Sequence, residues 1–249
     1  MAKLRSLIKL EGTLDGLTFY KTKDGYLVRT KGGVSKQRMA TDPAYARTRE
    51  NGAEFGHCAK MGKVLRRALL SLLTDAKDAR VVTRLMQTLN KVKNTDITSL
   101  RGERLVSVGL GTPDGKTHLR GFEFNTQAPL STVLLADFSL DPLTGTVSIA
   151  DFIPQQHLAV PEGATHVHLL SGYLNLDLDT GIKDLQLSPV LELAIDMTAT
   201  AVSLLPTAVP IGTGIPFYFL KIVFLQDVNG VLYPLHNGSH NALQLIDVG

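Results

Sequence analysis

Two short runs of β-favouring residues stand near the start of the chain, at 17–20 and 26–29, with an Asp-Gly pair between them. An Asp-Gly pair readily adopts the positive φ angles of a tight turn, so the pattern predicts a β-hairpin. The hairpin is basic, because lysines and an arginine flank the turn and the second run. Further along, Asp42 suits the N-cap of a helix and Pro43 suits its first turn, which predicts that a helix begins there.

Two amphipathic segments come next and predict a helical hairpin over residues 43–93. In the first segment, apolar residues recur at steps of three and four, the spacing of one helical face. These residues are Cys58, Met61, Leu65, Ala68, Leu69, Leu72 and Leu73. The second segment runs from Val81 to Val92 with the same spacing and ends among lysines, which suit the carbonyl end of a helix.

Beyond residue 102 the pattern changes to short apolar runs, bounded by combinations of Pro, Asp, Asn and Gly that form turns. The runs expected to form strands are 106–110, 132–135, 146–149, 166–170 and 217–225. No alternation of strand and helix patterns appears between 103 and 249, which argues against a doubly wound sheet. The spacing favours antiparallel structure in a sandwich or jelly roll of about eight to ten strands.

The sequence therefore predicts a mainly β protein with an N-terminal α-helical region, an α+β fold in two parts. Residues 1–102 form a basic N-terminal arm, made of the β-hairpin and the helical hairpin. Residues 103–249 form an antiparallel β-sandwich or jelly-roll-like domain. The composition agrees with a folded chain, because 44% of the 249 residues are hydrophobic and only 20% are charged.

Charge divides the chain at nearly the same place. Residues 1–105 hold 22 lysines and arginines against 10 aspartates and glutamates, a balance of +12, whereas the remainder holds 4 against 13, a balance of −9. A basic surface attracts nucleic acid, acidic lipid or an acidic protein face. In an assembly of identical copies, the basic arm of one subunit would contact the acidic domain of the next; alternatively, the arm only solvates its charges.

The basic residues assigned to contacts between subunits, or to binding of a polyanion, lie in the hairpin, in the segment after it and on the first helices. They are Lys21, Lys23, Arg29, Lys31, Lys36, Arg38, Arg47, Arg49, Lys60, Lys63, Arg66 and Arg67. This set is large enough for a phosphate-binding surface. Because the chain has no helix-turn-helix signature, no zinc module and few aromatic residues, any binding of nucleic acid would be nonspecific.

The sequence shows no export signal and no membrane span. Lys9 and Glu11 interrupt the apolar residues at the start, so the core of a signal peptide is missing. No stretch reaches the roughly 18 uninterrupted apolar residues that a membrane helix needs. We expect a cytoplasmic protein, unless a non-classical route or cell lysis releases it, for instance as part of a particle.

The triplet Asp179-Thr180-Gly181 is the sharpest catalytic signal in the chain. Asp-Thr-Gly forms the catalytic loop of aspartic proteases, in which two carboxylates share a proton, and the retroviral type needs one copy per chain. Those enzymes place the triplet after an apolar strand, whereas residues 175–178 alternate between polar and apolar. A turn after an edge strand is therefore the alternative interpretation.

His166 and His168 would share one face of a strand, a pattern that binds metals in some β-barrels. Further candidate ligands are His118, His157, His236 and His240. A cupin has a glutamate shortly after such a pair, and none follows here, so histidines on the solvent face of a half-buried strand are the simpler interpretation. Cys58 lies on a buried helical face, and no glycine-rich phosphate loop occurs. We expect no metal and no cofactor, and identify no small-molecule substrate.

Two parts of the chain resemble a known family. The segments that carry the likeness are 12–20, 25–29 and 41–55 near the start and 224–230, 233–235 and 241–243 near the end. They resemble an uncharacterised family of hypothetical proteins common in Bacteroidetes genomes, and the likeness implies no catalytic residue. The N-terminal pattern of a glycine-rich hairpin and an arginine-containing helix is also similar to segments of phage-like structural proteins, which implies a structural role.

These observations lead to three hypotheses. The first is a non-enzymatic, self-assembling structural protein, a subunit of a virion, tube or filament, in which basic N-terminal regions contact acidic C-terminal regions of other copies. The second is a protein that binds nucleic acid nonspecifically. The third is a hydrolase like the aspartic proteases, acting through Asp179.

Overall fold

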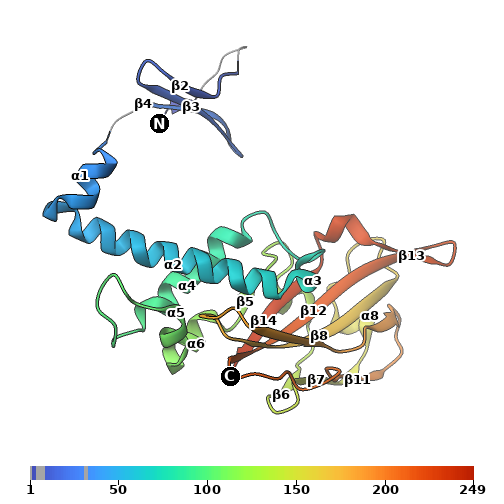
Figure 1. The fold of residues 1–249 in the computed structure, drawn as a ribbon. Helices are drawn as coiled ribbons and strands as arrows, with labels where there is room; N and C mark the ends of the chain where they lie inside the picture. The colour runs from blue at the N-terminus through green and yellow to red at the C-terminus, as the bar shows by residue number, and fades with distance from the viewer. Residues whose placement is uncertain (1, 4–8, 31–32) are drawn as a thin grey trace. The chain divides into compact units, whose positions relative to one another are not determined.

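The computed structural model describes residues 2–3, 9–30 and 33–249 (Figure 1). Its fold is mixed α and β, and its sheets are antiparallel. The chain divides into two compact units, residues 1–49 and 50–249. They are called the N-terminal unit and the main unit below.

The N-terminal unit contains a small antiparallel sheet with strand order β1-β4-β3-β2. The strands are β1 (Ala2–Lys3), β2 (Gly12–Leu14), β3 (Leu17–Thr22) and β4 (Gly25–Thr30). The predicted hairpin is confirmed as β3 and β4, and Gly25 adopts the positive φ angle, +110°, that the turn requires. Helix α1 (Lys36–Thr41) and the 3₁₀ helix η1 (Pro43–Tyr45) follow. The predicted cap is also confirmed, because the Asp42 side chain accepts a hydrogen bond from the Ala44 backbone N–H.

The main unit begins with two long helices, α2 and α4, and has shorter helices between its strands. Helix α2 spans Ala46–Ala68, so its first turn belongs to the N-terminal unit. The others are α3 (Leu70–Leu73), α4 (Val81–Asn94), α5 (Val106–Leu110), α6 (Pro113–Leu119), α7 (Leu130–Val133), α8 (Pro154–His157) and the 3₁₀ helix η2 (Leu235–Gly238). All seven apolar residues predicted for the buried face of the first helical segment are buried, in α2, in α3 or between them.

Two sheets make up the rest of the main unit. The large sheet has the order β10-β8-β12-β14-β5, with β9 also paired to β8 and β13 to β12, and the small sheet has the order β11-β7-β6. The strands are β5 (Phe122–Glu123), β6 (Ser139–Asp141), β7 (Thr146–Phe152), β8 (His166–Leu176), β9 (Lys183–Leu187), β10 (Leu191–Ala194), β11 (Thr200–Leu204), β12 (Ile215–Val228), β13 (Val231–Pro234) and β14 (Ala242–Val248).

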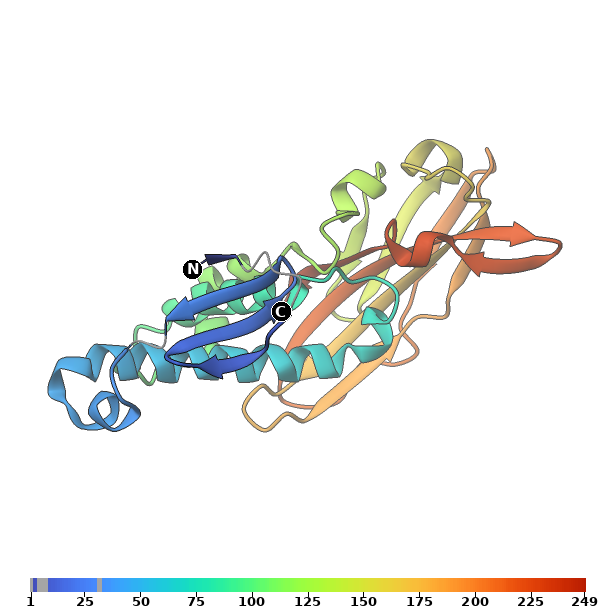
Figure 2. The same ribbon diagram turned by 90° about the horizontal axis from the view of Figure 1, so that it is seen from above.

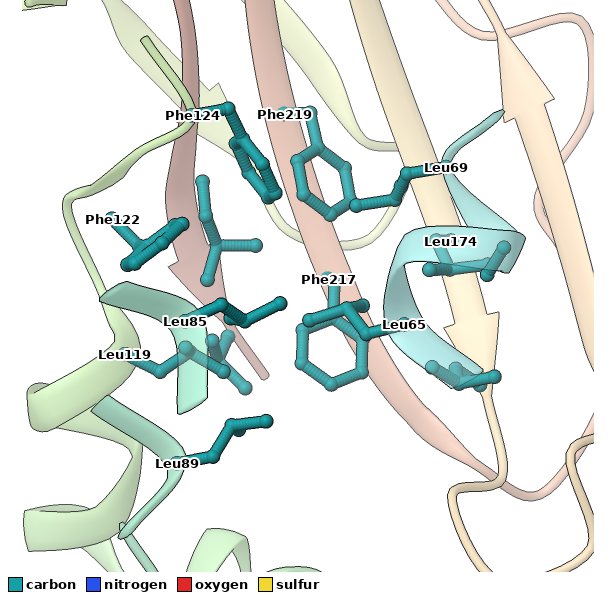
Figure 3. Packing of buried hydrophobic residues seen from close by; sticks show 14 of the residues in the cluster. Leu65, Leu69, Leu85, Leu89, Leu119, Phe122, Phe124, Leu174, Phe217 and Phe219 are labelled. Carbon is teal, nitrogen blue, oxygen red and sulfur yellow. The ribbon is translucent and has the colours of Figure 1, made fainter. Parts of the chain in front are cut away.

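Each face of the large sheet has its own hydrophobic core. On one face, Leu65 of α2 and Leu85 of α4 belong to the same buried cluster as Phe217 and Phe219 of β12 (Figure 3). On the other face, residues of β8 and β12 form a cluster with residues of the small sheet. Because successive strand residues point to opposite faces, one strand serves both cores. The large sheet is therefore the central layer of the main unit, with the helices and the small sheet on opposite faces.

Two segments that were expected to form strands contain helix instead. Residues 106–110 form α5, where Val106 and Leu110 share a buried side while Val108 is exposed. A strand would have placed these alternate residues on one face, whereas a helix brings the first and fifth residues together. The run 132–135 overlaps α7 instead. In both cases an alternating run of four or five residues is too short to distinguish a strand from one turn of helix.

The division between units also falls elsewhere than the expected boundary after residue 102. The chain separates after Arg49, and the helical hairpin belongs with the sheets. The reason is the first core, in which the apolar sides of α2 and α4 are covered by strand residues such as Phe217 and Leu243. In the described part of the chain, no helix is both long and apolar enough to cross a membrane.

Candidate functional site

Among the described residues of the N-terminal unit that have a burial class, none forms a buried core for its sheet. Every residue in 9–30 and 33–49 is exposed or half-buried. The register pairs Phe19 with Val28 and Leu14 with Leu17, so these four side chains lie on one face of the sheet. Leu14 is 62% and Leu17 38% exposed. We call the face with Leu14, Leu17, Phe19, Tyr26 and Val28 the apolar face of the N-terminal sheet.

Cations surround the aromatic rings of this sheet. Lys9 Nζ lies 5.3 Å and Lys21 Nζ 6.0 Å from the centre of the Tyr26 ring. The guanidinium of Arg29 lies 5.6 Å from the centre of the Tyr20 ring. Such contacts attract a cation to the face of the ring and hold it near the sheet. Both faces of the N-terminal sheet therefore combine apolar area with positive charge.

One edge of the N-terminal sheet is open. Strand β2 ends the strand order, and within the described residues no strand pairs with its outer edge. An open edge presents backbone N–H and C=O groups that can pair with a strand from another chain. The sheet thus offers two ways to contact a partner, through its apolar face and through the edge at Gly12–Leu14.

The basic residues around α1 and η1 have mixed roles. Arg38 forms an ion pair with Asp42 at 3.1 Å, and Arg49 Nη1 donates hydrogen bonds to the carbonyls of Met39 and Asp42 at 2.9 and 3.0 Å. The hydrogen bond from the Ala44 N–H, and next that from Arg38, lowers the pKa of Asp42. Arg38 and Arg49 therefore stabilise this turn, whereas Lys36 is exposed.

The other predicted basic residues lie on α2 in the main unit. Lys60, Lys63 and Arg67 are exposed, and Arg66 is half-buried near the end of the helix. The predicted set is therefore divided between the two units. The N-terminal group consists of Lys21, Lys23, Arg29, Lys36, Arg38, Arg47 and Arg49. Lys31 lies outside the described residues.

Asp179 lies in the connection between β8 and β9. The carboxylate of Asp177 accepts hydrogen bonds from the backbone N–H groups of Asp179 and Thr180 at 2.9 and 3.2 Å, and Gly181 has a φ of +78°. These features are typical of an aspartate-stabilised turn. Asp179 itself is exposed and accepts a hydrogen bond from the Ser107 hydroxyl at 3.1 Å. The triplet Asp179-Thr180-Gly181 thus forms a turn, as in the alternative interpretation of the sequence.

The two strand histidines have separate partners. His168 Nε2 lies 2.8 Å from a carboxylate oxygen of Glu192, and His166 Nδ1 lies 3.0 Å from the Thr165 hydroxyl. The described part of the chain contains no group of three histidine, cysteine, aspartate or glutamate side chains placed to hold a metal ion. Cys58 is buried, and this burial raises the pKa of its thiol.

A buried ion cluster between α2, α4 and residues 96–105 was not predicted. Glu54 is 2% and Lys93 4% exposed, and their side chains form an ion pair. Arg104 donates two hydrogen bonds, both at 2.7 Å, to the two carboxylate oxygens of Glu54. The Gly102 N–H donates a further one at 2.8 Å. The Arg104 guanidinium is the main reason why the pKa of Glu54 is lowered to about 2, against the opposing effect of burial.

Asp96 fixes the same segment from the other end. Its carboxylate accepts hydrogen bonds from the backbone N–H groups of Thr98, Ser99 and Leu105. Burial raises the pKa of Asp96, but these donors outweigh burial and hold that pKa well below its usual range. Glu54 therefore anchors residues 102–104 to α2, and Asp96 holds the segment 96–105 in its folded conformation.

A second unpredicted ion pair lies on the large sheet. Lys221, in the central strand β12, is 6% exposed and pairs with Asp75 from the connection between α3 and α4. The pair borders a cavity of about 230 Å³ with mostly apolar walls, including Val190 and Val223, and with His168 beside it. The sequence contained one signal for it, a lysine in the series of apolar residues on alternate positions of β12.

Comparison of the chain with models of protein families, with curated proteins and with solved structures finds no match.

Proposed function

We propose that the chain is a non-enzymatic structural protein that assembles with copies of itself, as a subunit of a virion, tube or filament. The observation that carries this proposal is the apolar face of the N-terminal sheet, which lies in a unit without one buried residue among those described. Leaving such a face in water forgoes about 25 cal/mol for each Å² of apolar area that could be buried. A sheet with a partly exposed apolar face and an open edge is suited to contact another chain.

A second copy of the chain is a suitable partner because the two units carry opposite net charge. Residues 1–49 hold 11 lysines and arginines against 4 aspartates and glutamates, whereas residues 50–249 hold 15 against 19. The N-terminal unit thus has a balance of +7 and the main unit a balance of −4. In our proposal the large and small sheets of the main unit form a sandwich-like body. The N-terminal unit of one copy contacts the acidic β-rich part of the next copy.

We expect large assemblies that become smaller at high salt, measured by light scattering and sedimentation of the purified protein. Screening weakens the attraction between oppositely charged units, while the apolar contact remains. The double substitution Phe19→Ser and Val28→Thr should weaken assembly at least about tenfold in dissociation constant, because about 1.4 kcal/mol of lost apolar burial corresponds to tenfold.

The matched control is Leu143→Ser, which removes an exposed leucine from the turn between β6 and β7 of the main unit. This variant should assemble like the wild type. A wild-type protein that stays monomeric at every ionic strength would overturn the proposed function.

Nonspecific binding of nucleic acid is a second candidate, supported by the cations held beside Tyr20 and Tyr26. If it is correct, a gel-shift assay at low salt will show retardation of DNA of any sequence. Replacing both Lys21 and Arg29 by glutamine should lower the slope of log affinity against log salt concentration by about 2, at about 0.9 per phosphate contact. The control is Lys91→Gln on α4. Unretarded wild-type samples at low salt rule this candidate out.

The hydrolase hypothesis for Asp179 stays a prediction. Its chemistry needs a second carboxylate beside the first, so that the two share a proton. The turn geometry of Asp179 and its hydrogen bond with Ser107 provide a structural role instead.

A further inference from the structure

A basic pocket opens in the main unit where α3 leads into α4. Its volume is about 320 Å³. Leu73 and Val81 are buried residues of its lining, and Leu70 and Val82 are exposed ones. We call this pocket, together with the cations at its rim described next, the basic pocket.

The rim of the basic pocket carries positive charge without a counter-charge. Arg66, Arg67 and Lys77 line it, and none of the three has a side-chain hydrogen bond or ion pair with another described residue. The Nε atom of Arg66 is buried without an acceptor. The carboxylate of Asp78, also in the lining, is already bonded to Arg84 and to Thr126. The pocket thus suits an apolar group that brings a carboxylate with it.

The main unit also has a projection that carries exposed apolar side chains and a carboxylate. Strands β12 and β13 form a hairpin that extends beyond the rest of the sheet (Figure 2). Its register places Val228, Val231 and Tyr233 on one face, and Val228 and Val231 are 46% and 50% exposed. Asp227 is exposed on the opposite face of the hairpin, where it pairs with Leu232, and its Oδ1 accepts a hydrogen bond from the Gly230 N–H at 2.7 Å. Asn229 and Gly230 close the turn with positive φ angles of +54° and +81°, so the tip has a defined conformation.

We propose that the tip of the β12–β13 hairpin of one copy inserts into the basic pocket of a second copy. Val228 and Val231 contact the apolar lining on one face of the inserted hairpin, and Asp227 on its other face turns its second carboxylate oxygen to the cations of the rim. Pocket and hairpin are different surfaces of the chain, so the contact is head-to-tail and repeats from copy to copy. The inference rests on the proposed self-assembly, but it uses neither the apolar face nor the edge of the N-terminal sheet.

A disulfide cross-link tests the contact directly. The one native cysteine, Cys58, is buried, so an introduced cysteine will be the reactive one. Val82→Cys and Val228→Cys are made as two separate proteins, mixed and oxidised. We expect a cross-linked dimer in the mixture, at least about tenfold more than when Val82→Cys is mixed with Leu143→Cys, whose cysteine is on another exposed turn. Equal yields in the two mixtures would overturn the proposal.

Charge reversal gives a second measurement on the same mixture. Arg67→Glu, in the Val82→Cys protein, should reduce the cross-link yield several-fold, because it places a carboxylate opposite Asp227. Lys63→Glu is the matched control, one helical turn earlier on the exposed side of α2 and outside the pocket. An unchanged yield with Arg67→Glu contradicts the proposed role of the rim.

The outcomes separate this inference from the proposed function. Wild-type assembly in light scattering without the Val82–Val228 cross-link overturns the hairpin contact and leaves self-assembly standing. Absence of any assembly overturns both. A small amphipathic anion retained by the purified protein in native mass spectrometry, with no cross-link, would assign the pocket to that ligand class instead and overturn the proposal.

Discussion

Replacing Glu54 by glutamine is expected to lower the free energy of unfolding by about 3–5 kcal/mol. The substitution keeps the shape of the side chain but leaves Lys93, which is as deeply buried, without a counter-charge. It also removes the charge from the paired hydrogen bonds with Arg104. Denaturant unfolding followed by circular dichroism measures the effect, at a protein concentration where the assembly state of both proteins is known.

Glu50→Gln is the matched control for this prediction. Glu50 lies one helical turn earlier on α2 and pairs with Arg101 at 3.3 Å, but both side chains are partly exposed. Exposed pairs contribute at most about 1 kcal/mol, so this variant should lose little stability. Equal losses for the two variants would contradict the assignment of the Glu54 cluster as a buried, structural ion group.

The same cluster makes stability depend on acidity. The pKa of Glu54 is about 2 in the folded chain and 4.5 as the ordinary value. A lowered pKa stabilises the fold above pH 4.5, and this contribution is lost as the pH falls from about 4.5 towards 2, amounting to about 3 kcal/mol. The wild type should therefore lose stability across this range more steeply than Glu54→Gln. Parallel curves for the two proteins would show that Glu54 does not titrate as the structure indicates.

Asp75→Asn is expected to cost about 3 kcal/mol of unfolding free energy, because it leaves the ammonium of Lys221 buried without its partner. The reverse change, Lys221→Met, should cost much less, since Asp75 is partly exposed and can be hydrated. The double variant should regain most of the stability, because an apolar side chain replaces the buried charge on the central strand.

The double-mutant cycle has an exposed ion pair as its control. Arg120 and Asp247 form an ion pair on the surface of the same unit, and Asp247→Asn should change stability by less than about 1 kcal/mol. If Asp75→Asn left the free energy of unfolding unchanged, the amine of Lys221 would have to reach water, and the ion pair would have no structural role.

Local patterns predicted local structure well. The Asp-Gly turn of the first hairpin, the Asp42 cap and the buried face of α2 all depend on residues within a few positions of one another. The charge asymmetry is likewise readable without coordinates, because it is a count along the chain. Short alternating runs were ambiguous. Residues 106–110 form helix α5 because this segment packs closely against α4. At the contact, Gly109 lies too close to the Val92 carbonyl for any side chain.

The buried charges could not be predicted. Lys93 reads as a cation at the end of α4, where it suits the helix dipole, yet its partner Glu54 stands 39 positions earlier. Lys221 and Asp75 are 146 positions apart. A charged side chain is buried only if a distant segment supplies its partner, and no periodicity within one segment reports that.

By itself, the sequence determined which segments are amphipathic, where the first hairpin lies, that Asp42 caps a helical turn, and on which half of the chain positive charge accumulates. The tertiary structure decided that the helical hairpin joins the sheets and that the N-terminal sheet has no core among the described residues. It also decided that an apolar pocket with a basic rim and an exposed hairpin occur in one unit. The physical reason is range: turns, caps and helical faces form from neighbouring residues, whereas cores, buried ion pairs and pockets form from residues brought together by packing.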